Sequence, residues 1–280
     1  MRGTKPLKRL GQHFLQDRNY LRKITELARL SATDLCLEIG PGTGNLTKYL
    51  AEKAGRVVAV EIDRNLAGRL ERDLPAAEII ERDFLELDLD ELSRRYGAER
   101  KWKMVSNLPF NITSPVLFRL IEKKTMFSAI YLLVQSEVAA RIVSGPGTKN
   151  YGILSVLCQM EADCRIVLRV PRTVFYPRPK VDSALVEIIP LEKTRFHAGR
   201  IDCFRAVVRS MFEHRRKTCY NSLRLGFKSG GCRGFLPRGK DADYFAGQAL
   251  KNAEVDGRMR PEAVSIEQFA RVSAWISAET

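Results

Sequence analysis

The tetrapeptide Asn107-Leu108-Pro109-Phe110, at the end of an expected strand, carries groups that suit a reaction at the amine of a nucleobase. An amine such as adenine N6 is a poor nucleophile, because its lone pair is delocalised into the ring. The Asn107 side-chain oxygen and the Leu108 carbonyl can accept its two hydrogens and favour a pyramidal nitrogen. Pro109 restricts Leu108 to extended backbone, and Phe110 offers a face for base stacking. A proline-containing turn at a strand end is the purely structural alternative.

A glycine-rich turn follows an earlier expected strand, Leu35–Ile39, and leads into a helix. Glycines allow positive φ and let the backbone approach a ligand closely, and the helix start offers free N–H groups to a carboxylate or phosphate. The order is Gly40-x-Gly42-x-Gly44 rather than the G-x-G-x-x-G of a pyrophosphate-binding turn. This spacing indicates a nucleoside that bears an amino acid, namely S-adenosylmethionine, and disfavours a nucleotide-dependent dehydrogenase.

Two carboxylates follow the next two expected strands. Glu61 lies 21 residues after Gly40, where an acid can accept hydrogen bonds from both ribose hydroxyls of such a cofactor. Asp83 follows the third strand and could accept from an adenine amino group. Each acid alone could be a strand-end cap, but their succession after the glycine turn favours a cofactor site.

The elements that must position these residues alternate between short apolar runs and amphipathic helical segments. This alternation predicts an α/β fold in which a doubly wound, Rossmann-like sheet has helices on both faces. The expected strands are Leu35–Ile39, Val57–Val60, Glu78–Ile80, Met104–Ser106 and Ile130–Val134, and we expect a late strand of an antiparallel edge at Ser183–Pro190. Asp17 is the expected N-cap of a first helix that reaches Leu30.

The helical spacing of the last third predicts a second, small all-α domain. We expect residues 1–195 to form the cofactor-binding catalytic domain and residues 196–280 a basic RNA-binding domain. Between Arg205 and Lys240 there are ten Lys or Arg residues and one acid, which favours phosphate contact over a solvated face. Gly226–Gly239 is an expected loop within this block. The candidate RNA-binding residues are Arg215, Arg216, Lys217 and Arg224.

Composition limits the other possibilities. The formal net charge of +14 attracts polyanions. No stretch approaches the 18 apolar residues of a membrane span, and the basic N-terminus lacks the apolar run of a signal peptide. The six cysteines and three histidines are scattered, which predicts neither a disulfide framework nor a metal site. A cytoplasmic, metal-free protein is expected.

On these motifs the sequence resembles the KsgA-type small-subunit ribosomal RNA adenine dimethyltransferases. The resemblance also covers Gly11–Leu15 (GQHFL), Phe175–Ala184 (FYPRPKVDSA) and His214–Leu223 (HRRKTCYNSL), in the family's order across almost the whole chain. It implies a class I methyltransferase fold and S-adenosylmethionine as cofactor. It further implies two methyl transfers to each of two adjacent adenines near the 3′ end of small-subunit rRNA, and a monomeric enzyme.

The resemblance also implies roles for single residues at the cofactor. His13 and Leu15 would close over it, Gly40 and Gly42 would contact its methionine end, and Glu61 its ribose.

Asp83 would bind the adenine of the cofactor, and Asn107 would lie where cofactor and target amine meet. Phe175 would be a second stacking face for the target base, opposite Phe110, although it could instead be a core aromatic. His13 and Phe110 depart from the family's frequent Asn and Tyr, so cofactor affinity and rate are open.

Two alternatives share this fold. One is a non-catalytic RNA-binding factor in ribosome assembly or transcription, which the intact tetrapeptide at Asn107 disfavours. The other is the related resistance methyltransferase of large-subunit rRNA. The segment His214–Leu223 resembles the small-subunit group more closely than this resistance group.

Overall fold

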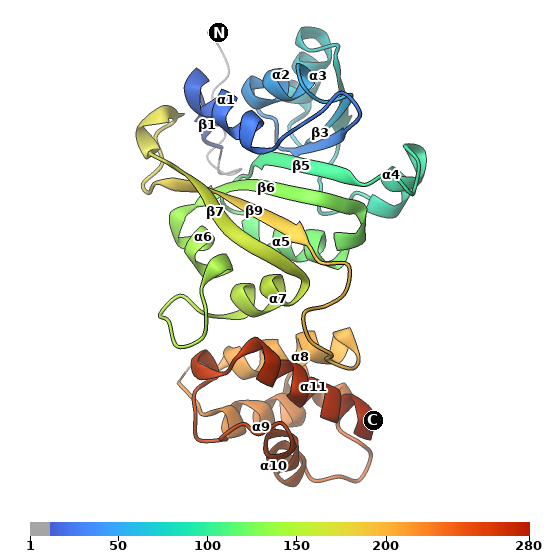
Figure 1. Ribbon diagram of the computed structural model, residues 1–280, viewed down its shortest axis with the longest axis vertical. Helices are drawn as coiled ribbons and strands as arrows, with labels where there is room; N and C mark the ends of the chain where they lie inside the picture. Colours follow the sequence, from blue (N-terminus) through green and yellow to red (C-terminus); the bar gives the residue numbers. More distant parts are fainter. Residues whose placement is uncertain (1–11, 215) are drawn as a thin grey trace. The chain divides into compact units, whose positions relative to one another are not determined.

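The computed structural model describes residues 12–214 and 216–280, and its contacts divide the chain into two compact units (Figure 1). The first unit comprises the residues up to 140 together with 163–192, and the second comprises 141–162 with 193–280. A domain boundary at residue 195, as expected from the sequence, would put the whole of 141–162 in the first unit. In the structure this segment belongs with the C-terminal helices, where the buried Tyr151 hydroxyl donates a 3.0 Å hydrogen bond to the Val264 carbonyl.

The first unit is built on a seven-stranded sheet in the order β4-β3-β2-β5-β6-β9-β7. Strands β2 to β6 are parallel, and β9 runs antiparallel to β6. The five predicted parallel strands are all present, each at or slightly beyond its expected bounds. The strands of the sheet are β2 (Leu35–Ile39), β3 (Arg56–Glu61), β4 (Ala77–Glu81), β5 (Trp102–Asn107), β6 (Phe127–Gln135), β7 (Ala162–Val170) and β9 (Ser183–Pro190).

Helices cover both faces of this sheet, as the sequence predicted (Figure 1). Asp17 caps the first helix as expected, because its carboxylate accepts hydrogen bonds from the N–H groups of Asn19 and Tyr20. The helices that begin in this unit are α1 (Arg18–Leu27), α2 (Asn45–Ala51), α3 (Arg64–Asp73), α4 (Leu89–Arg95), α5 (Thr113–Glu122) and α6 (Ser136–Val143), with short 3-10 turns η2 (Lys124–Met126) and η3 (Arg172–Val174).

The late strand β9 is antiparallel as expected, but it is not the sheet edge. The unpredicted strand β7 lies outside it and forms that edge. Three charged residues, Asp163, Arg165 and Arg169, interrupt the apolar run of β7 and are exposed, because an edge strand keeps one side in water. A second, two-stranded sheet pairs β1 (Phe14–Leu15) with β8 (Phe175–Tyr176) in antiparallel register.

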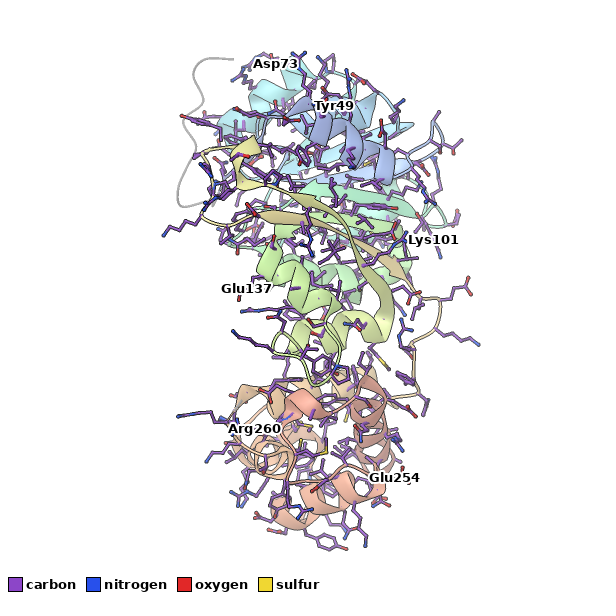
Figure 2. All side chains as sticks on the ribbon, turned by 60° about the vertical axis from the view of Figure 1, so that its left-hand side comes forward. Tyr49, Asp73, Lys101, Glu137, Glu254 and Arg260 are labelled. Atoms are coloured by element: carbon purple, nitrogen blue, oxygen red, sulfur yellow. The ribbon has the colours of Figure 1, made fainter. Side chains whose placement is uncertain are left out.

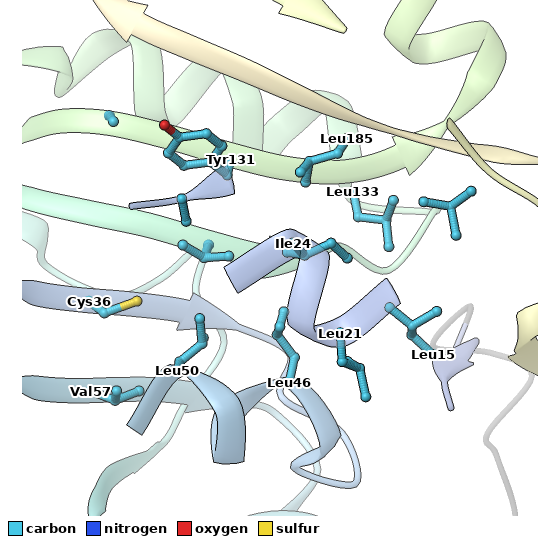
Figure 3. Close-up of a cluster of buried hydrophobic side chains, with 14 of the residues drawn as sticks. Leu15, Leu21, Ile24, Cys36, Leu46, Leu50, Val57, Tyr131, Leu133 and Leu185 are labelled. Atoms are coloured by element: carbon cyan, nitrogen blue, oxygen red, sulfur yellow. The ribbon is translucent and has the colours of Figure 1, made fainter. Parts of the chain in front are cut away.

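One hydrophobic core of this unit lies between the sheet and α1 and α2. Figure 3 shows Leu21 and Ile24 of α1 directed toward the strands, with Leu46 and Leu50 of α2 beside them. All four side chains are at most 4% exposed. Burying four such side chains contributes about 1.5–3 kcal/mol each, so this packing fixes the helix that follows the glycine turn.

The second unit is helical, as predicted. Its elements are α7 (Ile153–Glu161), α8 (Ile201–Glu213), α9 (Cys219–Ser229), α10 (Ala242–Asn252) and α11 (Ile266–Glu279), with 3-10 turns η4 (Arg233–Phe235) and η5 (Pro261–Ala263). Polar side chains project outward around it, for example near Arg260 and Glu254 (Figure 2). The loop predicted from Gly226 begins later, because α9 continues to Ser229. Gly226 lies within α9, where a Cβ would come 2.6 Å from the Ser210 Cβ, so this glycine allows α9 to approach α8.

Within the described residues, no helix combines the length and the apolar character that crossing a membrane requires.

Candidate cofactor and target-base site

The glycine turn after β2 has the backbone conformation that its sequence predicted. Gly40, Gly42 and Gly44 all have positive φ, between 60° and 76°. A Cβ on Gly42 would lie 2.6 Å from Cε1 of Phe14, so the turn and the N-terminal segment touch at this point. Only glycine allows both this conformation and this approach.

Glu61, at the end of β3, holds the turn in place. Its carboxylate accepts the Gly42 N–H at 3.0 Å through one oxygen and the Asp63 N–H at 3.0 Å through the other. Each carboxylate oxygen has a second lone pair, so Glu61 can still accept hydrogen bonds from hydroxyl groups of a ligand. Asp83, after β4, accepts the Leu85 N–H at 2.8 Å, which orients its carboxylate in the same way.

The N-terminal segment is tied across the carboxyl ends of these strands. The Asn45 side-chain amide donates to the Leu15 carbonyl at 2.8 Å, and the Asn107 amide donates to the His13 carbonyl at 2.9 Å. The His13 ring Nδ1 lies 2.7 Å from the Pro177 carbonyl oxygen. The segment is therefore fixed to α2, to β5 and to the loop after β8.

The tetrapeptide leaves β5 beside the glycine turn. The Ser106 hydroxyl donates to the Ile39 carbonyl at 2.6 Å, and the Leu108 N–H donates to the Leu133 carbonyl at 3.2 Å. The bond from Asn107 to His13 uses the nitrogen end of the side-chain amide. The oxygen end of Asn107 is consequently the one that can accept from an incoming amine.

These segments enclose one cavity of about 910 Å³, including its open mouth. Every residue predicted to bind the cofactor lines it, together with two further members of the tetrapeptide. The predicted residues in the lining are His13, Leu15, Gly40, Gly42, Glu61, Asp83, Asn107, Leu108 and Pro109. The parallel sheet brings together the residues that follow its strands, because the carboxyl ends of the strands meet at one edge, and the bonds from Asn45 and Asn107 add His13 and Leu15.

The two predicted stacking residues are placed differently. Neither Phe110 nor Phe175 is among the described residues that line the cavity. Phe110 is partly exposed, and its ring centroid lies 5.1 Å from that of His13. Phe175 is 5% exposed and belongs to the core cluster with Leu15, so in this conformation its ring faces the core. A second stacking face at Phe175 stays a prediction.

Two buried carboxyl groups give the cavity its electrostatic character. Glu38, the fourth residue of β2, is 1% exposed, and burial raises its pKa to about 8. Burial also raises the pKa of Glu61, although the N–H groups of Asp63 and Gly42 oppose the shift. Burial thus favours the neutral form of both carboxyl groups relative to exposed carboxylates.

Ile62, Arg82 and Phe84 are among the lining residues that were not singled out from the sequence. Ile62 is a large apolar side chain that is 50% exposed. Its position directly after Glu61 was the available signal, because an apolar residue beside a ribose-binding acid can cover a purine. Arg82 and Phe84 flank Asp83 and could have been found by extending that position by one residue on each side.

The predicted RNA-binding residues that the structure describes lie in the second unit, two of them between α8 and α9 and one on α9. Arg216 and Lys217 are exposed, and Arg215 lies outside the described residues. Arg224 is partly buried and donates to the Asp243 carboxylate of α10 at 2.9 Å, and Lys228 pairs with the same carboxylate at 2.5 Å. Asp243 was outside the block counted in the sequence, so Arg224 is less available to a phosphate than the count implied.

Comparison with known proteins shows the family to which this chain belongs. The model of the family described as ribosomal RNA adenine dimethylase matches residues 3–238. The chain belongs to the ribosomal RNA adenine dimethylase family. Among its relatives is the ribosomal RNA small subunit methyltransferase A of Geobacter sulfurreducens, 42% identical over 99% of this chain and 97% of the relative. That of Chlorobium phaeobacteroides is 40% identical over 94% and 90%.

Solved structures agree with the dimethylase fold. A dimethyladenosine transferase from Plasmodium falciparum superposes with a TM-score of 0.73 at 25% identity, over 92% of this chain and 95% of that one. The 23S rRNA methyltransferase ErmE superposes with a TM-score of 0.65 at 26% identity, over 92% and 97%.

Enzymes of this dimethylase family take the methyl group from S-adenosylmethionine, and the residues of the cavity fit that cofactor. The turn at Gly42 presents backbone without a side chain, and the carboxylates of Glu61 and Asp83 are oriented by backbone N–H groups. The predicted fold class and cofactor are thereby confirmed.

Proposed function

We propose that this protein transfers methyl groups to N6 of two adjacent adenines in the 3′-terminal hairpin of small-subunit rRNA, giving N6,N6-dimethyladenosine during ribosome biogenesis. One observation carries the proposal. Asn107 and Leu108 of the tetrapeptide line the same cavity as Gly42, Glu61 and Asp83, so acceptors for an amine lie beside a nucleoside site. The names of the curated relatives, which specify the small subunit, support this substrate.

The cofactor would be held by the backbone at Gly40 and Gly42, by Glu61 at its ribose and by Asp83 at its adenine, with His13 and Leu15 over it. When bound, S-adenosylmethionine supplies a methyl group that its sulfonium already activates.

Asn107 and Leu108 orient the target amine. The Asn107 side-chain oxygen and the Leu108 carbonyl accept one N–H each, which makes the nitrogen pyramidal and withdraws its lone pair from delocalisation into the ring. The Asn107 oxygen stays in place because the nitrogen of the same amide is bound to the His13 carbonyl. Catalysis then depends mainly on positioning and electrostatics. The amine loses one proton to water for each methyl group it gains, and no strong general base is required.

The target adenine reaches the cavity by leaving its stack. Phe110 offers the first aromatic face for the extruded base, and its contact with His13 fixes the ring at the cavity. Extrusion from a loop or helix end costs a few kcal/mol or less.

The second unit supplies the residues proposed to bind RNA. We propose that Arg216 and Lys217, both exposed, contact phosphates together with Arg215 and, to a smaller extent, the ion-paired Arg224. The net charge of +14 favours encounter with RNA in the same way. We further propose that the enzyme acts in the cytoplasm, as a monomer, on an assembly intermediate of the small subunit.

The likeness to a 23S rRNA methyltransferase makes large-subunit rRNA the second candidate substrate. Labelled methyl transfer to undermethylated small subunits, with naked large-subunit rRNA in parallel, separates the two. We expect nucleoside mass spectrometry to find N6,N6-dimethyladenosine in small-subunit RNA only. Label in the large-subunit rRNA would instead assign the enzyme to the resistance group, and tight subunit binding without label would indicate a non-catalytic factor.

A further inference from the structure

Tyr176 is a large aromatic residue that the fold leaves exposed. Its side chain is 57% exposed, whereas that of the preceding Phe175 is 5% exposed. The two residues form β8, and successive side chains of a strand point to opposite sides. Phe175 therefore anchors the strand in the core, and Tyr176 presents its ring to solvent.

The loop that follows Tyr176 is stiff and basic. Prolines occupy positions 177 and 179, and Arg178 and Lys180 between and after them are exposed. The Arg172 guanidinium donates to the Lys180 carbonyl at 2.8 Å, and the Arg172 N–H donates to the Asp182 carboxylate at 2.9 Å. These two bonds close the loop at its base, so little conformational freedom remains to be lost on binding.

This loop is attached to the wall of the cofactor cavity. Tyr176 pairs with Phe14 in the small sheet, and Phe14 lines the cavity. The carbonyl of the next residue, Pro177, bonds the His13 ring, which in turn contacts Phe110. Through these contacts the loop lies near Phe110, the residue proposed to stack on the target base.

We propose that Tyr176, Arg178 and Lys180 form a rim platform for the RNA strand on which the target lies. Tyr176 stacks on the base of a nucleotide next to the target adenine, and the two cations contact the flanking phosphates. An exposed aromatic ring interleaved with cations suits a single strand, because every base has a π-face and every nucleotide a phosphate. The inference rests on the proposed function and adds a residue that positions the substrate outside the cavity.

The test measures stacking directly. Single-stranded RNA with the sequence around the adenine pair carries 2-aminopurine at the nucleotide before or after the pair. We expect the wild-type protein with bound cofactor to quench its fluorescence. Tyr176→Ala should lose that quenching, and Tyr176→Phe, which keeps the ring, should retain it. Tyr244→Ala removes a tyrosine that is 62% exposed in the second unit and serves as the matched control.

Methyl transfer to undermethylated small subunits gives the second readout. For Tyr176→Ala we expect kcat/KM to fall about ten-fold, equivalent to ~1.4 kcal/mol, as for the loss of one base stack. Tyr176→Phe should stay within about two-fold of wild type, and cofactor affinity should be unchanged in both variants.

If Tyr176→Ala quenched the probe as strongly as the wild-type protein and had the same kcat/KM, the rim platform would be ruled out. Equal loss in Tyr176→Phe would also overturn it, because the hydroxyl rather than the ring would then be responsible. If the wild-type protein quenched the probe but transferred no methyl group to small subunits, the platform would stand and the proposed function would fail.

Discussion

The cavity of the first unit and the basic surface of the second, which comprises Arg216, Lys217 and Arg224, differ in how their residues are held. In the cavity, Glu61, Asp83 and Asn107 are each fixed by hydrogen bonds to backbone groups. On the basic surface, Arg216 and Lys217 extend into solvent, and the more ordered Arg224 is bound to an acid of the same unit.

This contrast indicates what a substitution should do in each region. Geometry within the cavity is specific, so one atom out of place affects the reaction at once. Affinity from a field of cations is shared among many residues and falls with salt. We therefore expect large, qualitatively distinct effects in the cavity and small, additive ones on the basic surface.

The largest effect should come from Asn107→Ala. It removes the acceptor for the amine and should lower kcat by about 10²–10³-fold, the scale found when one polar group that stabilises a transition state is lost. RNA affinity should change little. Single-turnover methyl transfer and filter binding measure the two quantities, with the exposed Asn252→Ala as control. Loss of RNA binding in Asn107→Ala would contradict the role assigned to this residue.

Glu38→Gln should change how stability depends on pH. The Glu38 pKa is about 8 in the folded protein against 4.5 for the unperturbed side chain. Between these values the unfolded state has released the proton that the folded state keeps, so the free energy of unfolding falls as pH rises and levels off above about 8.

Removing the ionisable group should abolish this part of the decline, which is on the order of a few kcal/mol. Denaturant unfolding at pH 5, 7 and 9 checks this. The exposed Glu71→Gln should leave the wild-type profile intact. A Glu38→Gln profile that runs parallel to wild type would mean that Glu38 is already ionised at neutral pH.

Gly42→Ala should lower the affinity for the cofactor at least about ten-fold. The new Cβ would lie 2.6 Å from Phe14, on backbone with a φ of 60°. Calorimetric titration with S-adenosylmethionine measures the loss. Gly145→Ala is the control, since a Cβ there meets nothing within 4 Å. Equal affinity in both variants would show that the turn does not contact the cofactor.

Charge reversal of Arg216 and Lys217 to Glu should lower RNA affinity on the order of ten-fold and flatten its salt dependence. Lys48→Glu with Lys53→Glu changes the net charge equally at exposed positions on and just after α2. A similar loss in both pairs would mean that total charge, and not this surface, governs binding.

The smallest effect should come from Arg224→Ala, which we expect to change RNA affinity less than about three-fold. The Arg224 guanidinium already forms an ion pair with the Asp243 carboxylate and is less available to a phosphate. Titration of the same RNA measures it. A larger loss than in the Arg216/Lys217 double variant would reverse the order proposed for the basic surface.

The sequence predicted the cavity well because its residues follow directly from strand ends. Each of Gly42, Glu61, Asp83 and Asn107 comes at or just after a buried parallel strand, and the sheet alone brings them together. No long-range side-chain contact had to be guessed.

What the sequence could not reveal depends on contacts between distant segments. The strand β8 has two residues, too few for alternation to show that Phe175 faces the core and Tyr176 solvent. Arg224 meets an acid 19 residues away, and the grouping of residues 141–162 with the C-terminal helices depends on packing that no local pattern encodes.

In the proposed function the two regions divide the work, with chemistry in the cavity and RNA affinity on the basic surface. Single-turnover methyl transfer to undermethylated small subunits, measured at rising enzyme concentration, separates the two contributions. We expect saturating enzyme to restore the wild-type rate in the Arg216/Lys217 charge-reversal variant and to leave Asn107→Ala slow. Rescue of both variants, or of neither, would contradict the division.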